Sequence, residues 1–153
     1  MPETKATLDS MADEMYELYK VIAAARSRQT GGPDDLSETE FLTLDLLTKE
    51  EPLTIGEVQR RVGVVPAQMS RIVRALEQQG GKGYIECKIN PMDRRRIDLF
   101  ITDIGHKAHD TYRAARLRTM YRVLEALDSR DRIEFMRMMN VIRLATTEKK
   151  KKY

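Results

Sequence analysis

The fold of this chain is decided by residues 53–102, which read LTIGEVQRRVGVVPAQMSRIVRALEQQGGKGYIECKINPMDRRRIDLFIT. Thr54 and Glu57 have the spacing of a capping box, in which a hydroxyl and a carboxylate bond the backbone at a helix start. We therefore predict a short helix that begins here and continues to about Val62. Gly63 then supplies a left-handed or tight turn that ends such a helix.

A second helix is predicted from Pro66 to Gln79. Proline is common at the first position of a helix, because the amide hydrogen that it lacks would have no partner within the helix there. Four apolar side chains at helical spacing form its buried face: Met69, Ile72, Val73 and Leu76. Two short helices joined by a glycine-containing turn of about three residues make a helix-turn-helix.

The other face of this second helix is polar or small, and it consists of Ala67, Gln68, Ser70, Arg71, Arg74, Ala75 and Gln78. Glutamine can bond the edge of adenine, arginine the edge of guanine, and serine either base. Alone, the two arginines would be ordinary solvated side chains. Beside a helix-turn-helix and a basic hairpin, this face predicts contact with DNA through Gln68, Ser70, Arg71 and Arg74.

The hairpin is predicted from the alternation of apolar and polar residues over 84–89 and 97–101, which has the period of a half-buried strand. One face is expected to hold Ile85, Cys87, Ile89, Ile97, Leu99 and Ile101, and the other Tyr84, Glu86, Lys88, Asp98 and Phe100. The connecting loop, residues 90–96, is long enough to project. Asp93 is expected to pair with one arginine, such as Arg96, and the arginines at 94, 95 and 96 to reach phosphates or a narrow minor groove.

Helices are predicted on both sides of this region. The first covers residues 6–29 and ends at Gly31-Gly32-Pro33; the next begins at Ser37, whose capping box uses Glu40, and runs to about Lys49. Leu53 and Thr54 are a candidate short strand beside the hairpin. After the hairpin, helices capped by Thr102-Asp103 and by Ser129 run to about Leu127 and Thr147. Apolar residues surround the last helix, so a second chain is expected to cover them.

Composition excludes several functional classes. The chain has 153 residues and a net charge of +3, and its first third is acidic while the rest is basic, which indicates one positive face. We expect a cytoplasmic protein without a membrane segment or secretory signal. The nucleotide-binding pattern does not fit residues 80–83. Nothing forms a catalytic constellation, so we expect no enzyme activity and no cofactor.

Two candidate sites outside the helix-turn-helix have ordinary explanations. Cys87 is the only cysteine, and on the apolar face of the hairpin it is expected to be buried and inert rather than redox-active. His106 and His109, near Asp103 and Asp110, have a spacing that permits a metal site. Because no third strong ligand is near and the start of this helix is expected to be solvated, we predict no metal.

In the order of its elements the whole chain resembles the MarR family of bacterial transcriptional regulators. The resemblance is most specific in LTIGEV at 53–58, SRIVRALE at 70–77, DRRR at 93–96 and LFITDIG at 99–105. It implies a single domain over 1–153, with a winged helix-turn-helix lobe at 37–102, dimerisation helices at 6–29 and 103–147, and a basic tail at 148–153. The fold class expected is mainly helical with a small β-hairpin wing.

The resemblance also implies a function. Such a protein would be a homodimer that binds pseudo-palindromic promoter DNA, usually as a repressor, and a small anionic or aromatic effector would release it. Met15, Tyr16, Tyr19 and Tyr112 are candidate residues of an effector pocket, although they are equally expected to be core or interface residues. The alternative is a winged-helix module for protein–protein contact, or an architectural DNA binder of weak specificity.

The sequence departs from the family pattern in three places. Val65 stands where a serine often caps the recognition helix, and Ala67 and Gln68 stand where serine or threonine is common. The operator sequence therefore cannot be transferred from relatives. The link at residues 80–83 is longer than usual, which affects the reach of the wing.

Overall fold

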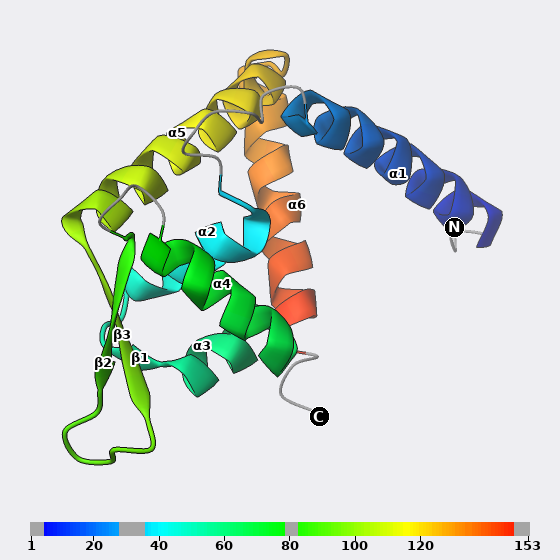
Figure 1. Cartoon of the computed structure of the whole chain (residues 1–153). Helices are drawn as coiled ribbons and strands as arrows, with labels where there is room; N and C mark the ends of the chain where they lie inside the picture. The colour runs from blue at the N-terminus through cyan, green and yellow to red at the C-terminus, as the bar shows by residue number, and fades with distance from the viewer. Residues whose placement is uncertain (1–4, 28–35, 79–82, 149–153) are drawn as a thin grey trace. The chain divides into compact units, whose positions relative to one another are not determined.

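The computed structural model describes residues 5–27, 36–78 and 83–148. The order of the elements is α1 (Lys5–Ser27), α2 (Glu38–Leu47), β1 (Leu53–Thr54), α3 (Ile55–Val62), α4 (Pro66–Gln78), β2 (Ile85–Ile89), β3 (Ile97–Ile101), α5 (Asp103–Glu125) and α6 (Ser129–Glu148) (Figure 1). The predicted fold class, mainly helical with a small antiparallel wing, is confirmed. The expected stop at Gly31-Gly32-Pro33, the link at 80–82 and the tail after Glu148 lie outside the described residues.

The chain divides into two compact units, Met1–Ala115 and Arg116–Tyr153. The first unit contains α1 to α4, the sheet and the beginning of α5, and the second contains the end of α5 and α6. No helix within the described residues combines the length and the apolarity needed to cross a membrane.

The core of the first unit forms where α2, α3 and α4 pack against one another and against the strands. Its buried apolar side chains are Leu36, Leu44, Leu47, Leu53, Val58, Met69, Ile72, Val73, Leu76, Tyr84, Ile85, Leu99, Ile101, Ala108 and Tyr112. All four residues predicted for the inner face of α4 are among them. Burial of this face decides which side of α4 remains available to a partner.

Both predicted capping boxes are confirmed. The Ser37 and Thr54 hydroxyls accept hydrogen bonds from the Glu40 and Glu57 amides at 3.3 Å, and each glutamate bonds back to the backbone of its cap. Gly63 ends α3 in the left-handed conformation, with φ of 78°. Since this conformation is costly for residues with a Cβ, glycine sets the sharp turn between α3 and α4. α2 ends at Leu47, two residues before the predicted end at Lys49.

The sheet is antiparallel and has the strand order β1-β3-β2. Leu53 lies opposite Leu99, which confirms the predicted short strand beside the hairpin. On the other side of β3, Ile85 lies opposite Ile101 and Cys87 opposite Leu99. The register therefore places the predicted apolar residues of the two hairpin strands on a common face.

The predicted division of the hairpin into a buried and an exposed face is wrong at both ends. Ile89, 67% exposed, and its partner Ile97, 41% exposed, lie at the end of the hairpin next to the wing loop, where the apolar face is not buried. Tyr84 precedes β2 and is buried, although it was expected on the polar face. Asp98, only 5% exposed, is tolerated because both its carboxylate oxygens accept hydrogen bonds from the Asn90 amide.

The start of α5 is held against the hairpin. The Thr102 hydroxyl accepts the Gly105 amide at 3.0 Å and donates to the Gly83 carbonyl at 2.9 Å, so the predicted cap also ties two segments together. An added Cβ at Gly105 would lie 2.1 Å from the Tyr84 carbonyl oxygen. Only glycine allows the helix and the hairpin backbone to approach so closely.

α1 and α6 both leave large apolar side chains exposed. On α1 these are Leu8, Met11, Met15, Tyr16, Leu18, Tyr19 and Val21, and on α6 they are Ile133, Met136, Met138, Met139, Val141, Ile142 and Leu144. The predicted cap of the last helix was wrong by one residue. Asp128, not Ser129, accepts hydrogen bonds from the amides of Arg130 and Asp131, each at 2.8 Å.

Candidate nucleic-acid interface

The outward face of α4 is exposed where the sequence predicted contact with DNA. Gln68, Ser70, Arg71 and Arg74 are all exposed, while Ala75, also predicted to face outward, is half-buried. The Ser70 hydroxyl donates to the Pro66 carbonyl at 3.1 Å, so Ser70 retains mainly its acceptor lone pairs for a partner. Within the described part of the chain, neither Arg71 nor Arg74 forms an ion pair.

The beginning of α4 has no side-chain cap. Its first hydrogen bond runs from the Met69 amide to the Val65 carbonyl at 3.0 Å, which places Val65 at the capping position. Valine has no acceptor for the amide hydrogens of the first turn, and its side chain is exposed. The departure from the family pattern at Val65 therefore has a structural consequence, because Val65 offers no side-chain acceptor to the amides of Ala67 and Gln68.

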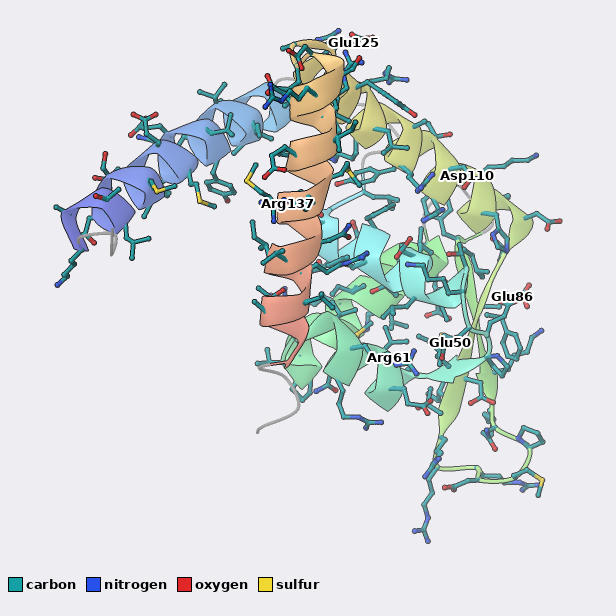
Figure 2. All side chains as sticks on the ribbon, turned by 180° about the vertical axis from the view of Figure 1, so that it is seen from behind. Glu50, Arg61, Glu86, Asp110, Glu125 and Arg137 are labelled. Carbon is teal, nitrogen blue, oxygen red and sulfur yellow. The ribbon has the colours of Figure 1, made fainter. Side chains whose placement is uncertain are left out.

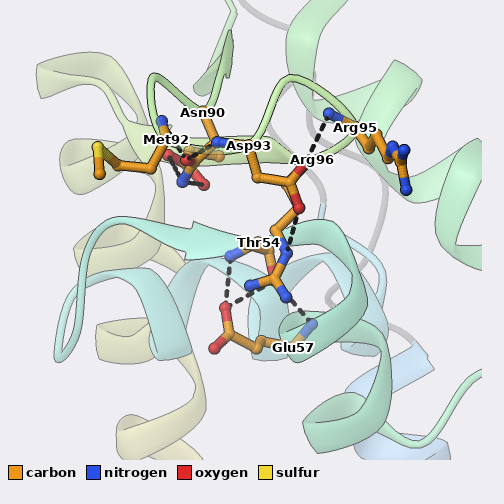
Figure 3. Close-up of polar contacts among 8 residues, drawn as sticks. Thr54, Glu57, Asn90, Met92, Asp93, Arg95 and Arg96 are labelled. Carbon is orange, nitrogen blue, oxygen red and sulfur yellow. Dashed lines mark hydrogen bonds and ion pairs between the residues drawn. The ribbon is translucent and has the colours of Figure 1, made fainter.

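The wing loop, residues 90–96, is held in one conformation by its own polar groups (Figure 3). The Asn90 side-chain oxygen accepts the amides of Met92 at 2.9 Å and Asp93 at 3.0 Å, while its amide group donates to buried Asp98. Asp93 accepts the Arg95 amide at 3.1 Å and pairs with the Arg96 guanidinium at 3.3 Å. The predicted pair of Asp93 and Arg96 is thus present, and it orders the loop rather than neutralising all three arginines.

The side chains at the tip of the wing point away from the core. Arg94, Arg95 and Arg96 are exposed, and Met92 is 94% exposed. In Figure 3 the Arg96 guanidinium lies near the cap formed by Thr54 and Glu57, whereas the Arg95 side chain points away from it. The wing arginines therefore differ, because Arg96 pairs with Asp93 and its guanidinium lies beside the cap of α3, whereas the Arg95 side chain extends away from that cap.

A cleft of about 320 Å³ separates the wing from α3. It is lined by Thr54, Ile55, Gly56, Glu57, Arg60, Arg95, Arg96 and Ile97. Hydrogen bonds from Thr54 lower the pKa of the Glu57 carboxyl, so this group is ionised at neutral pH. Arg60 is a functional candidate that sequence reasoning missed, since nothing in the sequence indicates that α3 and the wing share a cleft.

The candidate effector residues fall into two different environments. Met15, Tyr16 and Tyr19 are exposed on α1, and the Tyr16 and Tyr19 rings stack with centroids 6.2 Å apart. Tyr112 is buried and stacks on Phe41 with centroids 4.7 Å apart. Tyr112 is thus a core residue of the first unit, which was one of the two readings offered for it.

His109 belongs to a structural network rather than a solvated helix start. It is 6% exposed, stacks on Phe41, and places its two ring nitrogens 3.1 Å from carboxylate oxygens of Asp45 and Asp110. The expectation that this end of the helix is solvated was therefore wrong at His109. Although burial opposes it, hydrogen bonds from Lys49 and His109 hold the pKa of Asp45 below its usual value. Among the described residues no group of three histidine, cysteine or acidic side chains is arranged to hold a metal ion.

Cys87 is half-buried on the hairpin. Burial, together with a hydrogen bond to Glu77, raises the pKa of the thiol to about 12. Because the thiolate is the reactive form, this environment agrees with the expectation of an inert cysteine.

Comparison with known proteins gives the same assignment. Residues 36–97 match the model of the MarR family. The fold is similar to that of YusO from Bacillus subtilis (23% identity, TM-score 0.73, covering 94% of this chain and 99% of that one). It is also similar to Streptococcus pneumoniae FabT solved in complex with DNA (17%, 0.74, 92% and 98%) and to the PcaV transcriptional regulator of Streptomyces coelicolor with its natural ligand (20%, 0.59, 95% and 99%). The comparison with curated proteins gave no match.

The family match covers the part of the chain in which α2, α3, α4 and most of the wing are built, and the similarity of fold extends over more than nine-tenths of the chain. Residues 36–97 therefore match the MarR family, and the chain as a whole has the winged helix-turn-helix fold of these solved structures.

Proposed function

We propose that this protein is a homodimeric repressor that acts in the cytoplasm by binding pseudo-palindromic promoter DNA. The observation that carries the proposal is the exposed polar face of α4 next to a rigid wing tipped with arginines. The similar protein FabT was solved in complex with DNA, which supports the same use of the fold here.

The two parts of this surface would have different tasks. Gln68, Ser70 and Arg71, with Arg74 a turn later, would enter the major groove and contact base edges. Arg94, Arg95 and Arg96 on the wing would contact phosphates or the adjacent minor groove, and would contribute affinity more than specificity. The uncapped amides of Ala67 and Gln68 would add a further phosphate contact at the start of α4.

A second copy of the chain is proposed as the cover of the apolar residues exposed on α1 and α6. Seven large apolar side chains on α6 are exposed, and three of them are methionines. Exposed apolar surface of this extent is rare in a soluble monomer. In the proposed dimer the two recognition helices must be separated by about 34 Å to enter successive major grooves.

An effector that changes this separation would release the DNA. PcaV was solved with its natural ligand, and the exposed residues Met15, Tyr16 and Tyr19 of α1 remain the candidates for contact with a small anionic or aromatic molecule here. Tyr112 would take part only indirectly, through its packing on Phe41.

Selection of binding sites from random DNA, followed by footprinting on the recovered sequence, tests the proposal. We expect a pseudo-palindrome with half-sites one helical turn apart. Uniform weak binding that disappears at moderate salt would instead favour the alternative of an architectural DNA binder. Absence of any DNA binding would favour a winged-helix module for protein–protein contact.

A further inference from the structure

The cleft between α3 and the wing brings together arginines from two separate elements. Arg60 comes from the last turn of α3, while Arg95 and Arg96 come from the end of the wing loop. The Arg60 Nη1 atom lies 3.7 Å from the position that a Cβ on Gly56 would occupy, so this guanidinium reaches back over the first turn of α3. A larger residue at position 56 would narrow the space that Arg60 occupies.

The charge of the cleft is positive. Three arginines and one glutamate line it, which gives a net charge of +2. Glu57 is engaged by the backbone amide and hydroxyl of Thr54, at 2.8 and 2.6 Å, so its carboxylate already serves as the cap of α3. Asp93 neutralises part of Arg96 through a single contact at 3.3 Å, but a guanidinium has five N–H donors and others remain for a ligand.

The neighbouring arginine provides an internal comparison. Arg61 follows Arg60 directly, but it pairs with Glu50 at 2.9 Å (Figure 2). It is not among the residues that line the cleft. The two residues therefore have the same chemistry and almost the same place in the sequence, and only one of them faces the wing. If the cleft has a specific role, replacing Arg60 must have a larger effect than replacing Arg61. If only the positive charge matters, the two replacements must have equal effects.

We propose that this cleft is a binding site for a phosphate group, held by the guanidinium groups of Arg60 and Arg96. Planar guanidinium groups bind phosphate oxygens in pairs, and a volume of about 320 Å³ admits one phosphate with its ester groups. Two sources have this chemistry, a phosphate of the DNA backbone and free inorganic phosphate. The DNA source rests on the proposed function, and there the cleft would clamp one backbone phosphate between the helix-turn-helix and the wing.

The first arm of the test uses DNA. Arg60→Ala and Arg60→Gln are compared with Arg61→Ala on the selected operator at several salt concentrations. Loss of one phosphate contact reduces the slope of log affinity against log salt by about one. We expect this for both Arg60 variants, with binding weakened about fivefold to tenfold, and a smaller change for Arg61→Ala. A methylphosphonate, which removes the charge of one phosphate, is then placed at each flanking position of the operator in turn. At one position per half-site it should abolish the difference in affinity between wild type and Arg60→Ala.

The second arm uses inorganic phosphate without DNA. The amide resonance of Gly56 is followed by NMR during a phosphate titration, with chloride at the same ionic strength as the reference. A saturable shift in wild type that is lost in Arg60→Ala and kept in Arg61→Ala identifies free phosphate as a ligand. If the effect of Arg60→Ala depends on one DNA phosphate but free phosphate causes no shift, the DNA backbone is the only source of the bound phosphate.

The proposal is overturned if neither arm gives a response that depends on Arg60, or if Arg60→Ala and Arg61→Ala change both measurements equally. Failure of the proposed function has a different signature. In that case the wild-type protein selects no DNA sequence, and the phosphate titration still reports whether the cleft binds its ligand.

Discussion

The close contact between Gly105 and the Tyr84 carbonyl predicts that Gly105→Ala lowers the stability of the fold. The same change from glycine to alanine at Gly56, which has no such contact, should not. A Cβ at position 105 would lie 2.1 Å from the Tyr84 oxygen, and Cβ contacts under 3.0 Å are essentially never found. The start of α5 and the backbone before β2 would have to separate by about 1 Å, because neither partner in this contact is a flexible side chain.

The magnitude follows from the contacts that such a separation disturbs. Overpacking of a close-packed site costs about 1–3 kcal/mol. The Tyr84 oxygen also accepts the Thr102 amide at 3.0 Å, and weakening that bond adds up to about 1 kcal/mol. The helix propensity of alanine returns at most about 1 kcal/mol. We therefore expect Gly105→Ala to lower the free energy of unfolding by about 2 kcal/mol.

Gly56→Ala is the matched control. An added Cβ there meets only the Arg60 guanidinium, at 3.7 Å, which is an ordinary contact with the end of a flexible side chain. We expect no loss of stability, and a gain of up to about 1 kcal/mol from the helix propensity of alanine.

Urea unfolding and thermal unfolding, each followed by circular dichroism, measure the free energy of unfolding and the Tm of both variants. All samples must have the same protein concentration, because the stability of an oligomer depends on it. In a chain of this length a loss of about 2 kcal/mol lowers Tm by roughly 4–8 °C. Equal stability of Gly105→Ala and Gly56→Ala would refute the argument that backbone approach requires glycine at position 105.

Three further predictions concern the wing, the cysteine and the assembly. Replacing Arg95 and Arg96 together by alanine should weaken operator binding at least tenfold in a fluorescence anisotropy titration, and unchanged affinity would contradict the role assigned to the wing. Burial raises the pKa of Cys87 to about 12, whereas the thiol of the urea-unfolded chain has an ordinary pKa of about 8.5. The folded protein should therefore react with iodoacetamide at pH 8 much more slowly than the unfolded chain. Equal rates would show that the thiol is activated. Light scattering at micromolar concentration should give a dimer, and Met136→Glu with Met139→Glu should dissociate it; a folded wild-type monomer would refute the proposed cover of α6.

The sequence alone determined the local elements of this protein. The capping boxes at Ser37 and Thr54 and the turn at Gly63 depend on residues within four positions of one another, so their physics is contained in a short stretch. The buried face of α4 follows from the period of the helix in the same way. Subtracting that face from α4 left Gln68, Ser70, Arg71 and Arg74 outside, and the structure exposes all four.

Only the tertiary structure decided how far each face is covered and which distant residues meet. The alternation of the hairpin is the same along its whole length, but Ile89 and Ile97 next to the wing loop are exposed while Ile85 and Ile101 at the other end are buried. Asp98 is buried because Asn90 satisfies it across the hairpin, and His109 meets Asp45 from a segment far away in the sequence. Arg60 and Arg61 are indistinguishable in the sequence, and the fold alone places the first in the cleft beside Arg96 and the second against Glu50.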